Sequence, residues 1–294
     1  MLRNWCREDA NIAGEHENYS RNVAKWIEQG YTRPGLCFVW TEESVIKGGI
    51  AFSADDPGSA TILDFSLSPD LFHLGAEVLN QSISRLFAQC ASYHLYNDNE
   101  MYTQYKQCFI DAGFIVAQEK LSFRFTKETP ITVPAIVPAG NIVFRSYAEV
   151  GEKDFTEAVA LVTRNTLDRI DAGYFAKYGH DDFSAAGMMI KDLKEIDFQP
   201  DIWVLAYIGD EMIGLVIPSD FGDNLGGINY IGVVPTERGK GYVDILLNKG
   251  VQLLKDRGVA TIIADVDVLN FPMKEALERN GYDFYYDEVV LERR

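Results

Sequence analysis

Hydrophobic positions in residues 141–294 alternate between the spacing typical of strands and that of helices. Apolar runs and strict alternation predict strands, whereas apolar residues three and four positions apart predict helices. A mixed β-sheet covered by helices, an α/β (α+β mixed sheet) fold class, is therefore expected. The predicted elements are a strand over 142–145, helices over 154–164 and 182–193, strands over 202–207, 212–217 and 228–234, a helix over 242–256, a strand over 261–268, a helix over 272–278 and a strand over 282–291.

The first half of the chain repeats the later part of this order. Its predicted elements are strands over 37–40, 45–52 and 60–67, a helix over 72–91, a strand over 93–96, a helix over 101–111 and a strand over 114–125. Residues that end predicted elements recur in the second half at nearly the same separation. Pro69 precedes Pro235 by 166 residues, and Gly113 precedes Gly281 by 168. An internal repeat is the simplest explanation.

A proline-rich segment separates the two halves. Residues 127–140 read KETPITVPAIVPAG and contain Pro130, Pro134 and Pro138. Proline opposes helix and is disfavoured in a central strand, so this segment is interpreted as a linker. The predicted domains are residues 1–126 and residues 141–294.

Composition and charge narrow the classes of partner. The chain is 47% hydrophobic and 24% charged, which is ordinary for a globular protein, and carries a net charge of −17. That field repels nucleic-acid phosphates and anionic membranes, so neither is an expected partner. Acidic residues follow the N-terminus closely and no long apolar run occurs, which favours a cytoplasmic location.

The cysteines and histidines do not have the spacing of a metal site. Four cysteines lie far apart in the first half, and four histidines are equally scattered. A helix offers two ligands to one metal only where they are close in sequence, as in H-E-x-x-H. We therefore expect no metal cofactor and no disulfide framework.

The most informative segment is a glycine-containing loop between a predicted strand and a predicted helix, residues 231–244. At the N-terminus of a helix, free main-chain N–H groups and the helix dipole form an anion site suited to a pyrophosphate. Gly239 and Gly241 allow the main chain to approach the anion, and Arg238 and Lys240 add donors and positive charge. Taken alone, these four residues are equally compatible with a polar turn before a surface helix.

Two segments of the second half resemble the GNAT acyltransferase superfamily. Residues 233–242 read V-V-P-T-E-R-G-K-G-Y, which is similar to the family's acetyl-CoA loop, [RQ]-x-x-G-x-[GA] after a strand that ends V-x-P. Val243 departs from the usual Gly or Ala. Asn270 and the pair Gly281-Tyr282 fall in register with the family's second motif, in which Met273 replaces the usual Ala. The resemblance covers residues 141–294 and implies two GNAT-like acyl-CoA N-acyltransferase domains in tandem.

The resemblance implies transfer of an acetyl group from acetyl-CoA, as co-substrate, to an amine. In that fold the parallel strands that hold Val233 and Asp265 part, and the pantetheine arm lies between them. The main chain near Val233 would polarise the thioester carbonyl, and Asn270 would bind the arm or serve only as a helix N-cap. The expected coenzyme-binding residues are Ile231, Val233, Arg238, Gly239, Lys240, Gly241, Tyr242, Val243 and Asn270.

The catalytic residues are harder to assign. The family's usual general acid, a tyrosine four residues before the helix-ending glycine, is replaced by Leu277. Tyr282, Tyr285 and Tyr286 are the candidates to replace it, and departure of the thiolate without an acid is the alternative. For each tyrosine the other interpretation is a place in the core or in a strand. Asp265 shares a strand face with Asp267 and is the candidate base or acceptor-binding carboxylate. The alternative is that this face meets solvent.

The corresponding loop of the first half has lost most of this pattern. Phe72 and His73 stand where the motif has Arg and Gly, only Gly75 is retained, and Glu77 stands where Gly or Ala belongs. A carboxylate in the first helical turn competes with a phosphate for the positive helix end. Residues 1–126 are therefore interpreted as a degenerate GNAT-like domain that binds coenzyme poorly.

The leading hypothesis is an acetyl-CoA-dependent N-acetyltransferase whose acceptor is a small, cationic amine. The net charge of −17 favours a cationic acceptor. Another acyl donor or an oxygen nucleophile is compatible with the same loop. A non-catalytic acyl-CoA-binding or scaffold protein is the alternative of a different class, for which Leu277 and Val243 are the evidence. Transfer from an aminoacyl-tRNA is disfavoured because no basic stripe is present. No oligomeric state follows from the sequence.

Overall fold

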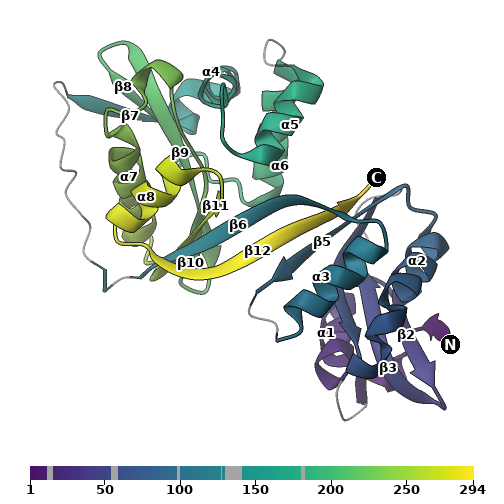
Figure 1. The fold of residues 1–294 in the computed structure, drawn as a ribbon. Coiled ribbons are helices and arrows are strands. Elements are labelled where there is room, and N and C mark those ends of the chain that lie inside the picture. The colour runs from purple at the N-terminus through teal and green to yellow at the C-terminus, as the bar shows by residue number, and fades with distance from the viewer. Residues whose placement is uncertain (12–15, 54–58, 98–99, 127, 130–140, 180–182) are drawn as a thin grey trace. The chain divides into compact units, whose positions relative to one another are not determined.

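The computed structural model describes residues 1–11, 16–53, 59–97, 100–126, 128–129, 141–179 and 183–294. The chain divides into two compact units, shown in Figure 1. The first unit comprises Met1–Glu119 and Glu288–Arg294, and the second comprises Lys120–Asp287. Most of the predicted linker over 127–140 lies outside the described residues.

The first unit is a mixed sheet with three α-helices among its described residues. The strand order is β1-β2-β3-β4-β5-β12, and β4 and β5 are the parallel neighbours. Its elements are β1 (Leu2–Asn4), α1 (Glu17–Glu28), β2 (Cys37–Glu42), β3 (Val45–Phe52), β4 (Ser59–Leu67), the 3₁₀ helix η3 (Pro69–Leu74), α2 (Gly75–Leu86), β5 (Cys90–Tyr96), α3 (Tyr102–Asp111) and the first part of β6 (Ile115–Thr126).

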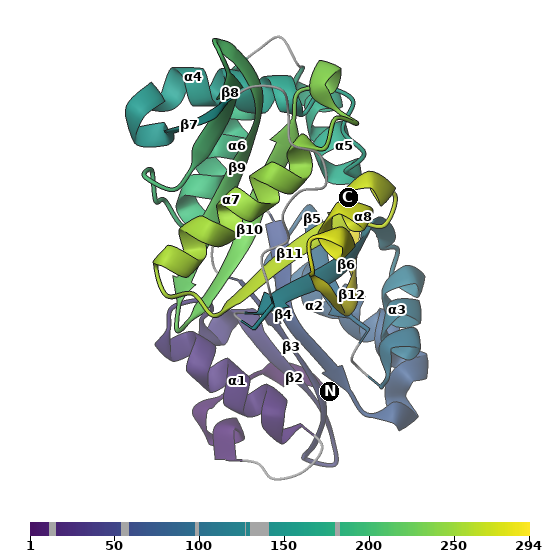
Figure 2. The ribbon, with the colours of Figure 1, turned by 90° about the vertical axis from the view of Figure 1, so that its left-hand side faces the viewer.

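The second unit has the same strand order, β7-β8-β9-β10-β11-β6, with β10 and β11 parallel. Helices α7 and α8 lie on one side of this sheet, and α4, α5 and α6 lie on the other (Figures 1 and 2). Its elements are β7 (Ile142–Ser146), α4 (Tyr147–Val162), α5 (Arg169–Tyr178), α6 (Phe183–Ile196), β8 (Val204–Ile208), β9 (Glu211–Gly222), β10 (Leu225–Val233), α7 (Tyr242–Asp256), β11 (Thr261–Asp267), α8 (Phe271–Arg279) and the first part of β12 (Asp283–Arg293).

Each unit takes the last strand of its sheet from the other half of the sequence. In the second unit, residues 120–126 of β6 pair antiparallel with β11. In the first unit, residues 288–293 of β12 pair antiparallel with β5. The compact units therefore differ from the predicted domains 1–126 and 141–294. The repeated pattern gives β6 and β12 equivalent positions, and does not specify which sheet each one joins.

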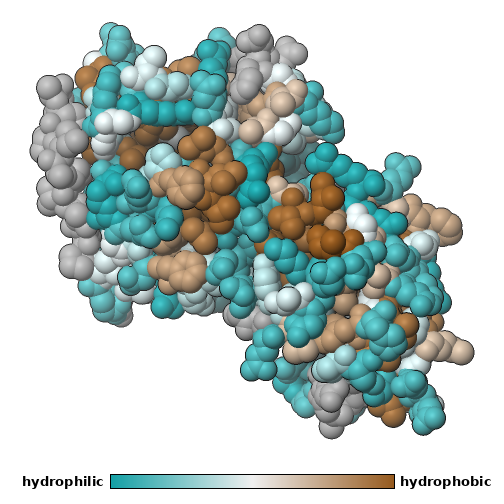
Figure 3. All heavy atoms as spheres, viewed as in Figure 1, coloured by the Kyte–Doolittle hydropathy of each residue, from teal (hydrophilic) through white to brown (hydrophobic). Residues whose placement is uncertain are grey.

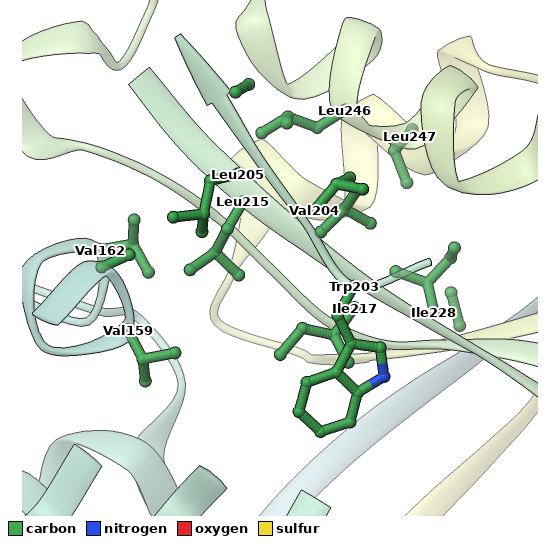
Figure 4. Packing of buried hydrophobic residues seen from close by; sticks show 14 of the residues in the cluster. Val159, Val162, Trp203, Val204, Leu205, Leu215, Ile217, Ile228, Leu246 and Leu247 are labelled. Atoms are coloured by element: carbon green, nitrogen blue, oxygen red, sulfur yellow. The ribbon is translucent and has the colours of Figure 1, made fainter. Parts of the chain in front are cut away.

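The core of the second unit lies on both faces of its sheet. Figure 4 shows Leu205 and Leu215 beside Val159 and Val162 of α4, whereas Val204 lies toward Leu246 of α7. This follows from the alternation of side chains along each strand. The largest fully buried side chain of the unit is Trp203, whose ring contacts Phe155 of α4 at 5.9 Å between centroids.

Most predicted strands and helices are present, and the mixed α/β fold class is confirmed. Among the described residues, the strand β1 and the α-helices α1 and α5 were not predicted. The helix predicted from residue 72 instead begins at Gly75, because residues 69–74 form the 3₁₀ helix η3. Strands β8 and β9 form an antiparallel hairpin, with Gly209 of its turn in the left-handed region at a φ of 60°.

Candidate functional site

The parallel strands β10 and β11 part soon after they begin. Their register covers only three residue pairs and ends at Gly227 opposite Ile263. Beyond that point β10 continues to Val233 along β9, and β11 continues to Asp267 along β6. A β-bulge between Ile228 and Tyr230 marks the same place on β10. The parting expected from the resemblance is thus present.

The main chain of β10 presents hydrogen-bonding groups to the parted side. The N–H of Val234 donates to the carbonyl oxygen of Ile213 at 3.0 Å, so the main-chain groups of Val234 point toward β9. Main-chain groups of successive residues in a strand point to opposite sides. The main-chain groups of Val233 and Ile231 therefore point away from β9, toward the side where β11 has separated. The main chain of both residues is thus oriented to bind a coenzyme arm between the parted strands, as expected.

The loop after β10 leaves the N-terminus of α7 open. Gly239 and Gly241 have φ values of 77° and 81°, a left-handed conformation that favours glycine. No side chain in the described part of the chain caps α7. Among the described residues, the N–H groups of residues 239–243 donate no hydrogen bond. These donors and the helix dipole suit the pyrophosphate of a coenzyme.

Arg238 has a different role from the one expected. Its Nε donates to the carbonyl oxygen of Val233 at 3.2 Å. Its terminal nitrogens donate to carbonyl oxygens at the end of α4 and just beyond it, those of Val162 (2.9 Å), Arg164 (2.8 Å) and Asn165 (2.9 Å). Helix ends carry unpaired carbonyls and partial negative charge, which attract a guanidinium. Arg238 therefore fastens the loop to α4, and four of its five N–H donors are already used.

Lys240 is also partly engaged. Its ammonium group forms a salt bridge with Glu237, at 2.9 and 3.0 Å from the two carboxylate oxygens. The main-chain donors of residues 239–243 therefore form the principal anion-binding feature of the loop. Lys240 remains exposed and adds positive charge near it.

The remaining coenzyme candidates divide between the core and the site. Tyr242 is buried in the core of the second unit, and Val243 is partly buried against that core. Asn270 is the N-cap of α8, because its Oδ1 accepts from the N–H of Met273 at 3.3 Å. The N-cap role of Asn270 is therefore confirmed, and its Nδ2 is left as the group for the predicted contact with the coenzyme arm.

The two carboxylates of β11 have different environments. Asp265 is exposed, as the alternative interpretation of its strand face expected. Asp267 is 1% exposed, and its Oδ2 accepts from the N–H and Nε of Arg169 at 3.1 and 3.0 Å. A buried carboxylate paired in this way serves structure, because it fixes the start of α5 to β11.

Tyr282 is in the core, which corrects its assignment as the general acid. It is 3% exposed and its ring contacts Phe125 at 5.2 Å between centroids. Burial raises the pKa of its hydroxyl above the ordinary value. Leu277, at the position of the usual tyrosine, is also completely buried. A buried side chain does not reach a thiolate at the site, so the alternative interpretation of Tyr282 applies.

Sequence reasoning missed a carboxyl group beside the parted strands. Asp171, in the first turn of α5, accepts a hydrogen bond from the hydroxyl of Tyr230 on β10 at 3.3 Å. Burial, reinforced by the negative charge of Asp168, raises the pKa of Asp171 to about 7. The available signal was an N-cap, because Asp168 precedes the helix and its Oδ1 accepts from the N–H of Asp171 at 2.9 Å.

In the first unit, the equivalent position between the strands is filled by a side chain. The pairing of β4 with β5 ends at Ile62, and the hydroxyl of Tyr105 on α3 accepts from the N–H of Leu67 at 3.3 Å. Leu67 corresponds to Val233 at the offset of 166 residues. The ring of Phe72 packs on that of Tyr105, with centroids 5.2 Å apart. A protein side chain thus uses the donor that would bind an acyl-CoA arm.

Gly75 of the first unit has a packing role. Its φ is −55°, so it is not in the left-handed conformation of Gly239 and Gly241. A Cβ placed there would lie 2.2 Å from the Sγ of Cys108 on α3. Close packing of α2 on α3 therefore explains this glycine, without any anion.

The buried carboxyl group of Asp64 on β4 should make the protein less stable as the pH rises. Burial raises its pKa to about 6, above the roughly 3.9 of an unfolded chain. The folded protein therefore binds more protons, and the free energy of unfolding falls by about 2 kcal/mol as the pH rises from 4 to 7. Asp64→Asn should abolish this pH-dependent loss of stability and raise the melting temperature at pH 7.5. Thermal unfolding from pH 4 to 8 measures it, and an unchanged pH dependence in the variant would contradict the prediction.

Two features are absent from the described residues. No group of three or more His, Cys, Asp or Glu residues is placed to hold a metal ion. No helix in that part of the chain is long and apolar enough to cross a membrane. The face drawn in Figure 3 is largely hydrophilic with separate apolar areas, in keeping with the acidic composition.

Part of the chain matches the model of a known family. Residues 166–282 match the model of the acetyltransferase (GNAT) family. No curated protein matches the sequence significantly. The chain is similar to the structure of a GCN5-related N-acetyltransferase from Sphaerobacter thermophilus, with 16% identity, a TM-score of 0.67 and coverage of 100% of this chain and 95% of that one.

Two other structures are similar along the whole chain. One is a tandem GNAT protein from the clavulanic acid biosynthesis pathway, with 11% identity, a TM-score of 0.56 and coverage of 100% of this chain and 98% of that chain. The other is a GNAT-family acetyltransferase from Colwellia psychrerythraea, with 12% identity, a TM-score of 0.53 and full coverage of both chains. The family match includes the parted strands, the loop and α7. Residues 166–282 therefore match the acetyltransferase (GNAT) family, and the whole chain has the fold of GNAT acetyltransferases.

Proposed function

We propose that this protein is an acetyl-CoA-dependent N-acetyltransferase with one working site, in the second unit. The observation that carries the proposal is the parting of β10 and β11 beside the uncapped N-terminus of α7. The parted strands suit the extended arm of the coenzyme. The N–H groups of residues 239–243 suit its pyrophosphate. The acceptor is proposed to be a small molecule with a primary amine.

The residues of the second unit would divide the work as follows. The N–H donors of residues 239–243 hold the pyrophosphate, and Lys240 adds charge. The main chain of Ile231 and Val233 binds the arm and polarises the thioester carbonyl, a contribution of about 3 kcal/mol where such donors are well placed. Asn270 donates to the arm through Nδ2. Arg238 keeps the loop in position through its bonds to α4.

Calorimetric titration of the whole protein with acetyl-CoA tests the coenzyme site. One molecule bound per chain is expected, because Tyr105 uses the equivalent donor of the first unit and Glu77 occupies the first turn of α2. Two molecules per chain would contradict the degenerate first unit. No binding would contradict the proposed function, and binding without transfer to any amine would favour the scaffold alternative.

Lys240→Glu should weaken acetyl-CoA binding about tenfold, because it reverses a charge close to the N-terminus of α7. Lys240 is exposed, so little change in melting temperature is expected. Lys191→Glu is the matched control, since Lys191 is an exposed lysine of α6 in a salt bridge with Glu195. Calorimetry measures both affinities. Equal affinities of the two variants would remove Lys240 from the site.

A further inference from the structure

We infer that Asp171 accepts the proton of the acceptor's primary ammonium group and so makes the amine nucleophilic. This inference rests on the proposed function and assigns a residue and a substrate class to its acceptor side. The exposed Asp265 was the carboxylate expected in this role.

The position of Asp171 carries the inference. Its Oδ2 accepts a hydrogen bond from Tyr230 at 3.3 Å. Tyr230 lies on β10 beyond Gly227, where the pairing with β11 has ended, and directly precedes Ile231. The carboxyl group is therefore beside the part of β10 whose main chain is proposed to bind the thioester.

The first turn of α5 is held by both parted strands. Arg169 bonds to Asp267 of β11 at 3.0 Å through Nε, and Asp171 contacts β10 through Tyr230. The N-cap bond from Asp168 to the N–H of Asp171 fixes the turn itself. These contacts hold the Asp171 carboxyl where the strands separate, and such fixed geometry is what proton transfer requires.

The environment of Asp171 gives its carboxyl the basicity that the reaction needs. Burial is the largest cause that raises its pKa to about 7, and the charge of Asp168 adds to it, while the hydrogen bond from Tyr230 opposes both. On the neighbouring strands, Asp267 is paired with Arg169, and the nearby cation Arg238 is bound to main-chain carbonyls. A base whose pKa lies near the working pH is the most effective.

Acetyl transfer removes two protons from the acceptor nitrogen. The ammonium group gives one proton to Asp171, and the free amine forms a C–N bond with the thioester carbon as the C–S bond breaks. The second proton lost by nitrogen neutralises the departing thiolate, and Asp171 releases its proton to solvent. The net products are an amide, a free thiol and one proton.

The test measures thiol release from acetyl-CoA with spermidine, glucosamine and lysine as acceptors, in the whole protein and in Asp171→Asn. The variant retains an oxygen that accepts from Tyr230, so the fold should persist. The expected result is a fall in kcat of roughly 10²–10⁴-fold, with unchanged acetyl-CoA affinity by calorimetry. Glu157→Gln, which removes an exposed carboxylate of α4, is the control and should change neither.

Two further variants separate catalysis from structure and keep the test decisive if Asp171→Asn folds poorly. Asp168→Asn keeps an N-cap but removes a charge that raises the pKa of Asp171, so the acidic limb of the kcat/KM profile should move to lower pH. Tyr230→Phe removes a hydrogen bond that lowers this pKa, so the limb should move to higher pH. A purely structural role predicts neither shift.

The outcomes for this inference and for the proposed function differ. Acetyl transfer that survives in Asp171→Asn, or an acidic limb that stays fixed in both other variants, would overturn the inference alone. Acetyl-CoA binding with no transfer to any of the three amines would overturn the inference together with the proposed transferase activity. Absence of acetyl-CoA binding would overturn the coenzyme site itself.

Discussion

A chain cut to residues 141–294 is expected to fail to fold as a soluble domain. The cut removes residues 120–126 of β6, which pair with β11, and with them Phe123 and Phe125, which are 0% and 1% exposed. Losing a buried phenylalanine costs about 3–5 kcal/mol, so two approach the roughly 5–15 kcal/mol that stabilise a whole domain. The cut also leaves Val289 and Leu291 of β12 without their partner strand β5.

The control is a chain that follows the compact unit, residues 120–287. It retains the complete sheet β6-β11-β10-β9-β8-β7 and should be soluble and bind one acetyl-CoA. Size-exclusion chromatography and thermal unfolding of both chains measure the difference. Cooperative unfolding of a soluble 141–294 chain would show that the sheet does not need β6.

Replacing Arg238 with Met is expected to lower both stability and acetyl-CoA affinity. The guanidinium donates to carbonyl oxygens of Val162, Arg164, Asn165 and Val233. Partly exposed bonds of this kind contribute about 0.5 kcal/mol each, so the loss is about 2 kcal/mol. For a unit of this size, that lowers the melting temperature by roughly 4–8 °C. Affinity should fall because the loop is no longer held against α4.

Arg238→Lys separates this role from a simple charge effect. Lysine retains the positive charge but lacks the planar fork that reaches several carbonyls, so it should lose nearly as much melting temperature as Arg238→Met. Differential scanning fluorimetry and calorimetry provide the two measurements. Full affinity and full stability in the lysine variant would assign Arg238 back to the anion.

Local sequence accounted for the loop and the strand that precedes it. The left-handed Gly239 and Gly241 and the N-terminus of α7 depend on neighbouring residues, so the order of residue types was enough to place them. The same holds for Asn270, whose N-cap bond spans only three residues. The partners of Arg238 were not predictable, because Val162 is 76 positions away in the chain.

Helix α5 shows why one candidate for the site was missed. Only Phe175 of its ten residues is buried, so the apolar periodicity that indicates a helix is weak. Its start is held by Asp267 on a strand almost a hundred residues later. The raised pKa of Asp171 arises from burial in that assembled environment, and no local pattern carries it.

The sequence by itself determined the repeated order of strands and helices, the glycine-containing loop and the loss of that loop in the first half. These follow from residue types and short spacings. Only the tertiary structure decided that β6 and β12 complete the sheets of the opposite halves, that Arg238 holds α4, that Tyr282 is buried and that Tyr105 fills the first unit's gap. The physical reason is that each of these features depends on contacts between residues far apart in the sequence. Equivalent local patterns are compatible with more than one such partner.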